Sequence, residues 1–165
     1  MKKIKYIVMD VDGTMTDGKI YMGNDGEIMK AFDIKDGYAI SQIMPGNNIV
    51  PIVITGRKSQ IVENRCRELG VDELYQGCLD KKEKLLDIAK KYGADIKDGI
   101  IKGFAFIGDD ILDIPAMEIS EYSACPVDAS EEVMKIVDYT CKSKGGDGAI
   151  REYIDWLLKN ELNYS

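Results

Sequence analysis

The chain has 165 residues with a net charge of −7 and a sequence pI near 4.7, an acidic balance that argues against a nucleic-acid partner, which normally requires a basic surface. Its four cysteines form no CxxC pair and it has no histidine, which disfavours a zinc site and makes reduced thiols the default. Because residues 1–3 lead into the first apolar run without a signal region, and no run has the length of a membrane span, we expect a cytoplasmic protein that does not bind membranes.

The first predicted element is a strand over residues 4–9, and two carboxylates follow it at once. Asp10 and Asp12 are separated by one residue and precede Gly13. Open α/β sheets bind their ligands at the carboxyl ends of strands, so both acids are expected at a site. Because burying two carboxylates costs on the order of several kcal/mol without a compensating cation or proton, we expect a divalent metal beside them.

A β-hairpin is predicted next, over residues 19–32. Residues 19–22 and 27–32 have the composition of strands, and the turn-rich tetrapeptide 23–26 separates them. One interpretation is a surface flap. The other is an oligomerisation element, because an isolated hairpin with exposed apolar side chains is marginally stable and needs a covering surface.

The rest of the chain alternates between helices and strands. The predicted elements, in order, are a helix over 36–44, a strand over 49–54, a helix over 59–69, a weak strand at 74–75, a helix over 82–92, a strand over 103–107, a helix over 111–119, a weak strand over 122–125 and helices over 131–137 and 149–159. This alternation is typical of an α/β fold with a doubly wound, mostly parallel, Rossmann-like sheet. We find no composition break or internal repeat, so residues 1–165 are expected to form one domain.

Polar residues follow several of these strands or open a helix. Thr55 ends the strand over 49–54, Lys81 opens the helix over 82–92, and Asp109 follows the strand over 103–107. Each has a simpler interpretation: Thr55 in an ordinary turn, Lys81 on a solvated face with Lys82 as the competing candidate, and Asp109 or Asp113 as a helix cap. Only their joint occurrence favours a catalytic site.

Four motifs in this order resemble those of the haloacid-dehalogenase-type phosphatases. They are DVDGT at 10–14, IVITG at 52–56, DK at 80–81 and IGDD at 107–110 with Asp113 nearby. The resemblance implies that Asp10 attacks the phosphoryl group to form an aspartyl phosphate and that Asp12 is the general acid and base. The segments between Asp10 and Thr55 and between Lys81 and Asp109 have no room for a lid domain, so the chain is similar to the capless branch of this superfamily.

The same resemblance implies roles for the other motif residues. Mg²⁺ would be held by Asp10, by the backbone carbonyl of Asp12 and by Asp109, with water completing the octahedron. Thr55 and Gly56 would contact the phosphoryl group, and Lys81 would neutralise the charge that develops on it. Asp110 and Asp113 stay open alternatives, since either could orient a metal-bound water or Lys81.

A second, longer resemblance narrows the substrate. Seven blocks together are similar to the family of 3-deoxy-D-manno-octulosonate 8-phosphate phosphatases, namely residues 17–18, 21–24, 30–32, 36–38, 54–58, 75–77 and 145–152. This resemblance implies a small sugar acid phosphate as substrate and a Mg²⁺-dependent cytoplasmic homotetramer. In that family the hairpins associate centrally, and the C-terminal tail, here about 142–165, approaches a neighbour's site.

Arg57 favours an eight-carbon substrate within this resemblance. Similar phosphatases of nine-carbon sugar acid 9-phosphates have an acidic residue at this position, whereas the octulosonate enzymes have arginine. A guanidinium suits a substrate carboxylate through bidentate pairing. Arg57 could also be an ordinary surface residue, so a nonulosonate or sialic acid 9-phosphate stays the alternative substrate.

Two other protein classes are weighed against a phosphatase. A receiver-like signalling module also uses clustered aspartates, threonine and lysine, but its lysine follows the last of these strands, whereas Lys81 precedes the strand that ends at Asp109. A noncatalytic binding module would typically have lost Asp10 or Asp12, and both are present. An enzyme is therefore the favoured interpretation.

Overall fold

The computed structural model describes the backbone of residues 4–163 and the side chains of residues 4–160. Its strands are β1 (Tyr6–Met9), β2 (Tyr21–Gly23), β3 (Gly26–Met29), β4 (Val50–Ile54), β5 (Glu73–Tyr75), β6 (Ile96–Lys97), β7 (Ile100–Ile107), β8 (Ser120–Cys125) and β9 (Tyr139–Thr140). Its helices are α1 (Ile34–Tyr38), α2 (Met44–Gly46), α3 (Gln60–Leu69), α4 (Lys81–Lys91), α5 (Ile114–Met117), α6 (Glu131–Met134) and α7 (Ala149–Asn163), with short helical turns at Val11–Met15, Ala39–Ile43 and Ile111–Asp113.

One mostly parallel sheet organises the chain, in the order β5-β4-β1-β7-β8-β9, and β6 adds an antiparallel partner to β7. The predicted α/β class is confirmed. Met9, the last residue of β1, lies opposite Val53 of β4 and Ile107 of β7. Because these three strands end at nearly the same level, the residues that follow them meet at one edge of the sheet.

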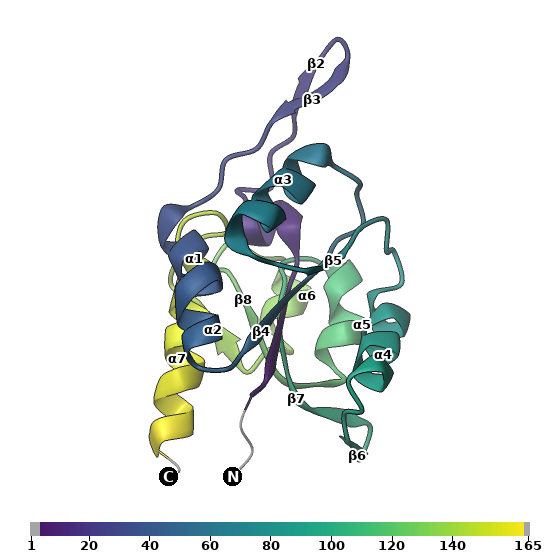
Figure 1. The fold of residues 1–165 in the computed structure, drawn as a ribbon, viewed down its shortest axis with the longest axis vertical. Coiled ribbons are helices and arrows are strands. Elements are labelled where there is room, and N and C mark those ends of the chain that lie inside the picture. Colours follow the sequence, from purple (N-terminus) through teal and green to yellow (C-terminus); the bar gives the residue numbers. More distant parts are fainter. Residues whose placement is uncertain (1–3, 164–165) are drawn as a thin grey trace.

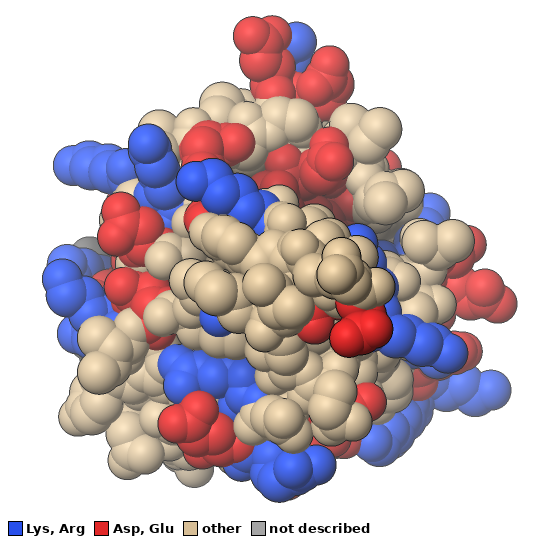
Figure 2. All heavy atoms as spheres, turned by 90° about the horizontal axis from the view of Figure 1, so that it is seen from above, with Lys and Arg blue, Asp and Glu red and all other residues tan. Residues whose placement is uncertain are grey.

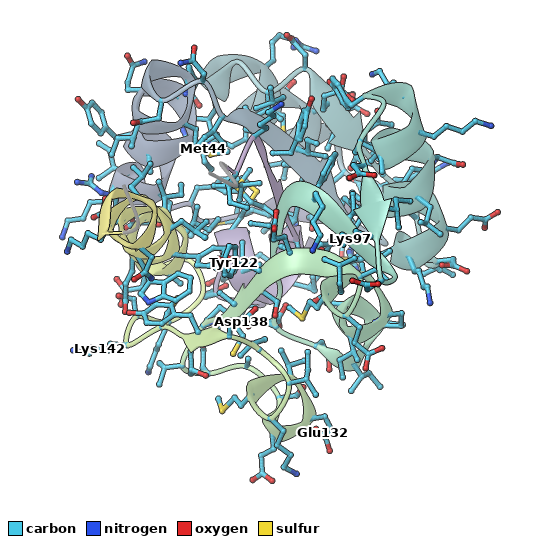
Figure 3. All side chains as sticks on the ribbon, turned by 90° about the horizontal axis from the view of Figure 1, so that it is seen from below. Met44, Lys97, Tyr122, Glu132, Asp138 and Lys142 are labelled. Carbon is cyan, nitrogen blue, oxygen red and sulfur yellow. The ribbon has the colours of Figure 1, made fainter. Side chains whose placement is uncertain are left out.

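Apolar side chains cover both faces of this sheet. Along β1, Ile7 and Met9 pack with residues of α2, α3 and α7, whereas Val8 packs on the other face with residues of α4, α5 and α6. The helices therefore form two layers (Figure 1). From the end opposite the hairpin, α7 and the helix that carries Glu132 lie on different sides of β8 (Figure 3). A sheet buried on both faces is a rigid base for the residues at its edge.

The hairpin predicted over 19–32 is present, with shorter strands than expected. β2 and β3 pair antiparallel and project beyond the carboxyl ends of the parallel strands (Figure 1). Met22 and Ile28 on it are 61% and 64% exposed. Figure 2 looks onto this end of the molecule and shows an uncharged area at the centre, bordered by acidic and basic side chains. Between the turn Val11–Met15 and β4 the chain forms only this hairpin and a helical run, so no lid domain is inserted there.

Several predicted element bounds were wrong. The helix expected over 111–119 is a short turn at Ile111–Asp113 followed by α5, and it ends at Met117. The helix expected over 131–137 ends at Met134. Strands β6 and β9 were not predicted, because two residues are too few to show a strand pattern. That residues 1–165 form a single phosphatase domain stays a prediction.

Among the described residues, no helix combines the length with the apolar composition that a membrane span requires.

Candidate active site

Three carboxylates meet where β1 and β7 end. Asp10 follows β1, Asp109 follows β7 after one glycine, and Asp113 lies at the end of the turn Ile111–Asp113. One carboxylate oxygen from each lies within 4.8 Å of the others. Thr55 follows β4 at the same edge and is 2% exposed. The structure therefore brings together residues from the first, second and fourth motifs.

Two glycines allow the carboxylates to approach one another. Gly13 has a φ of +92°, and a Cβ there would lie 2.0 Å from Oδ2 of Asp109. A Cβ on Gly108 would lie 2.5 Å from the carboxyl carbon of Asp113. Neither contact is sterically possible, so an alanine at either position would displace one of the acids. The hydroxyl of Thr14, the residue after Gly13, donates a hydrogen bond of 3.3 Å to Oδ1 of Asp109.

Lys81 joins two of these acids through one buried ammonium group. It is the first residue of α4, which begins where the Asp80 carboxylate accepts the Glu83 N–H. Its Nζ donates to Oδ1 of Asp10 and to Oδ1 of Asp113, each at 2.5 Å, and its side chain is 4% exposed. Lys82, the competing candidate, is exposed. Burial alone would lower the pKa of Lys81, but the two carboxylates hold it above its usual value.

The charge in this cluster is not balanced by lysine alone. Burial raises the pKa of Asp10 to about 6, against the lowering effect of Lys81 and with a further rise from Asp113. Burial, followed by the charges of Asp10 and Asp113, raises the pKa of Asp109 to about 8. Carboxylate oxygens are the ligands that Mg²⁺ prefers, and a divalent cation would hold both acids ionised. The residues present therefore fit such an ion.

Asp110 and Asp113, which the sequence could not separate, occupy different environments. Asp113 is 1% exposed, and its Oδ2 accepts the backbone N–H groups of Asp109 and Asp110 while its Oδ1 accepts from Lys81. Asp110 is exposed, and its carboxylate accepts the N–H of Ile111 as a local cap. Of these two acids, Asp113 is thus the one that contacts Lys81.

Asp12 is not part of this cluster of acids and instead contacts two cations. Its Oδ1 accepts from Nζ of Lys30 at 2.5 Å, and Nε of Arg57 lies 4.0 Å from its Oδ2. Arg57 is half exposed, and its second contact is Glu27 at 3.8 Å. Sequence reasoning placed no role on Lys30 or Glu27. Only their location in a predicted hairpin next to the first motif could have drawn attention to them.

The glycine-rich loop before α7 packs on the first motif of its own chain. The N–H of Gly146 donates to the carbonyl of Thr14 at 3.0 Å. A Cβ on Gly145 would lie 1.9 Å from the carbonyl oxygen of Gly13, so glycine is required for this approach. Lys142 and Lys144 on the same loop are exposed. The loop therefore supports the catalytic turn of the chain to which it belongs.

Comparison with known sequences identifies close relatives. The chain is 40% identical over 157 residues to 3-deoxy-D-manno-octulosonate 8-phosphate phosphatase KdsC of Escherichia coli, covering 95% of this chain and 80% of that protein. It is 37% identical over 155 residues to KdsC of Yersinia pestis, with 94% and 80% covered. No family model matches the chain.

Solved structures agree with these relatives. The phosphatase of the same name from Moraxella catarrhalis, in complex with a magnesium ion, a phosphate ion and a KDO molecule, superposes with a TM-score of 0.89 at 34% identity over 99% of this chain and 90% of that one. The cobalt-bound form of the deoxy-D-mannose-octulosonate 8-phosphate phosphatase from Haemophilus influenzae gives a TM-score of 0.88 at 34% identity, with 96% and 89% covered.

Proposed function

Since this chain belongs to the family of 3-deoxy-D-manno-octulosonate 8-phosphate phosphatases, we propose that it hydrolyses 3-deoxy-D-manno-octulosonate 8-phosphate to 3-deoxy-D-manno-octulosonate and phosphate. The reaction takes place at the cluster of aspartates, with Asp10 as the nucleophile. The chain is a phosphatase of the haloacid-dehalogenase type that uses Mg²⁺. The observation that supports the assignment most strongly is the meeting of Asp10, Asp109 and Asp113, of which Asp10 and Asp113 contact the buried ammonium of Lys81.

Phosphate monoesters hydrolyse extremely slowly in water, so the site must lower a large barrier. In the first step an oxygen of Asp10 bonds to phosphorus while the bond to the sugar oxygen breaks, and Asp12 gives its proton to that oxygen. In the second step Asp12 takes a proton from the water that attacks phosphorus. The bond to Asp10 then breaks, which releases phosphate and restores both carboxyl groups.

The remaining residues position the reacting groups. Lys81 holds Asp10 and balances charge on the transferring group, while Asp113 fixes Lys81. Asp10, Asp109 and the backbone carbonyl of Asp12 would hold Mg²⁺, which when bound neutralises negative charge on the phosphoryl group. Thr55 and Gly56, at the end of β4, would contact phosphoryl oxygens. Asp110 is too exposed for more than a supporting role.

Three further aspects of the function are proposed on the same basis. The chain acts in the cytoplasm, as its free cysteines favour. It assembles as a homotetramer through the hairpin, whose exposed Met22 and Ile28 need a covering surface. Arg57, which is half exposed beside Asp12, would pair with the substrate carboxylate and favour the eight-carbon ester over nine-carbon esters.

A phosphate-release panel tests this proposal. It compares kcat/KM for octulosonate 8-phosphate, nonulosonate 9-phosphate, N-acetylneuraminate 9-phosphate and simple sugar phosphates. We expect the octulosonate ester to have the highest kcat/KM and all activity to stop with EDTA and return with Mg²⁺. A higher kcat/KM for a nine-carbon ester would establish the alternative substrate, and full turnover in EDTA would contradict the metal assignment.

A further inference from the structure

Lys30 is a buried cation next to the catalytic carboxylates for which the reaction described above has no role. It follows β3, and its side chain is 1% exposed. Its Nζ lies 2.5 Å from Oδ1 of Asp12 and 2.8 Å from Oε1 of Glu27. Burying an ammonium costs on the order of several kcal/mol unless it is paired, so these two carboxylates fix its position closely.

The hairpin is attached to the rest of the molecule through the same group of residues. Glu27 lies in β3, and its Oε2 accepts a hydrogen bond of 2.6 Å from the Ser59 hydroxyl. Ser59 is the residue that caps α3, where its side chain accepts the N–H of Val62. A continuous path of contacts therefore runs from α3 through Glu27 and Lys30 to Asp12. A short two-stranded hairpin is marginally stable alone, so this path sets where its base lies.

The contact with Lys30 also distinguishes the two oxygens of Asp12. The backbone at Asp12 and Gly13 leaves helical geometry, with φ and ψ of −74° and 113° at Asp12, and the Asp12 carboxylate is not part of the cluster formed by Asp10, Asp109 and Asp113. Lys30 donates to Oδ1, whereas Arg57, whose side chain is half exposed, lies 4.0 Å from Oδ2. Oδ2 is thus the oxygen left to exchange a proton with the substrate.

We propose that Lys30 is a positioning residue that holds Oδ1 of Asp12 and so aims Oδ2 at the leaving oxygen, which couples the seating of the hairpin to proton transfer. This inference rests on the proposed function of Asp12. The proton on Oδ2 passes to the ester oxygen as its bond to phosphorus breaks. The same oxygen takes a proton back from the water that cleaves the aspartyl phosphate.

The rate of the first step with different leaving groups shows whether Lys30 positions Asp12 or only stabilises the structure. An alkoxide leaves poorly without a proton, whereas an acidic phenol such as nitrophenol leaves without one. Alcohol or phenol release is measured in the first turnover with enzyme in excess, for the octulosonate ester, a simple alkyl phosphate and aryl phosphates of graded phenol acidity. The variants are Lys30→Met, Lys30→Arg and, as a matched control, Lys19→Met. Lys19 is a largely exposed lysine in the same segment, residues 19–32.

We expect Lys30→Met to slow alcohol release by about 100-fold, the lower end of the range for general acid–base catalysis, and nitrophenol release by about tenfold at most. Lys30→Arg restores part of the alkyl rate because it returns a cationic donor to Oδ1. Lys19→Met behaves as the parent protein. Equal losses for alkyl and aryl esters, or no loss for either, would overturn the proposal.

Two features keep the result interpretable. If Lys30→Met does not fold, the double variant Glu27→Gln with Lys30→Met removes one acid together with the ammonium, and the same leaving-group dependence is expected. The aryl series is informative even if the octulosonate ester is not a substrate. In that case the proposed substrate is wrong, while the dependence of the rate on phenol acidity still tests the role of Lys30.

Discussion

At the scale of single residues, the site holds more negative charge than its buried lysine balances. Lys81 contacts Asp10 and Asp113, whereas Asp109 has the hydroxyl of Thr14 as its hydrogen-bond donor. Burial raises the pKa values of Asp10 and Asp109, and the neighbouring carboxylates raise them further. The nucleophile must be ionised to attack, so a bound cation and Lys81 are needed together to keep Asp10 reactive near neutral pH.

Replacing Asp10 by asparagine removes the attacking oxygen while keeping the shape of the side chain. We expect kcat for phosphate release to fall by at least about 1000-fold. Circular dichroism should show an unchanged fold, since the variant is isosteric. If Asp10→Asn kept substantial activity while Asp12→Asn lost it, the two roles would have to be exchanged.

Arg57→Ala tests carboxylate recognition separately from the chemistry. The variant loses one charge-assisted hydrogen bond, which is expected to weaken binding of the transition state for the sugar acid phosphate by about 1.5–3 kcal/mol. This loss corresponds to a decrease in kcat/KM of roughly 10- to 150-fold. An aryl phosphate without a carboxylate serves as the control substrate and should be nearly unaffected. Equal losses on both substrates would place Arg57 in phosphate binding or folding instead.

At the scale of elements, the ends of the strands explain which parts of the site were predictable. Asp10, Thr55 and Asp109 each follow a strongly apolar strand, and parallel register brings such positions together, so the sequence alone indicated their neighbourhood. The contact of Lys30 with Asp12 depends on how the hairpin docks, and no local pattern encodes that docking. The broken helix after Asp110 was missed because a helical periodicity does not reveal where a run divides into a turn and a helix.

The junction of α1 and α7 has a pH dependence of its own. Asp36 of α1 is buried, and its carboxylate accepts the N–H of Arg151 in the first turn of α7 at 2.8 Å. Burial raises the pKa of Asp36 from 3.8 to about 6. Between these values the folded state binds more protons than the unfolded state, so the stabilising contribution present below pH 3.8 is lost as the pH rises through about 6.

Urea unfolding at several pH values measures this contribution. We expect the free energy of unfolding of the parent protein, relative to that of Asp36→Asn, to fall by about 2–3 kcal/mol between pH 4 and pH 6.5. Both proteins are measured with saturating Mg²⁺, so that the carboxylates of the active site do not contribute to the difference. A difference that is flat with pH, or that rises, would contradict the assigned shift.

At the scale of the whole molecule, two segments lie over the catalytic edge in place of a lid. The hairpin projects from that edge, and the loop with Gly145 and Gly146 packs on the catalytic turn (Figure 1). Helix α7, which follows this loop, buries Tyr153 and Ile154 completely in the core. The loop is therefore tied to the fold at both ends. The apolar side chains of the hairpin are exposed in the single chain, and only the proposed assembly would cover them.

Polar substitutions on the hairpin test the proposed tetramer. Light scattering should show a tetramer for the parent protein and a smaller species for the double variant Met22→Ser with Ile28→Ser, because these side chains are 61% and 64% exposed in the single chain. The matched control is Ile96→Ser, which should leave the tetramer intact. Ile96 is 50% exposed and lies at the opposite end of the molecule. A parent protein that is a fully active monomer would disprove the role of the hairpin in assembly.

The central claim, that Asp10 takes the phosphoryl group from a sugar acid phosphate, is tested most directly by trapping the intermediate. The enzyme is mixed with Mg²⁺ and octulosonate 8-phosphate, quenched in acid within one turnover, digested and analysed by mass spectrometry. We expect the phosphoryl group on the peptide that contains Asp10, and none on that peptide in Asp10→Asn. A phosphoryl group on another residue, or release of phosphate at the full rate with no phosphorylated peptide at any quench time, would contradict the account.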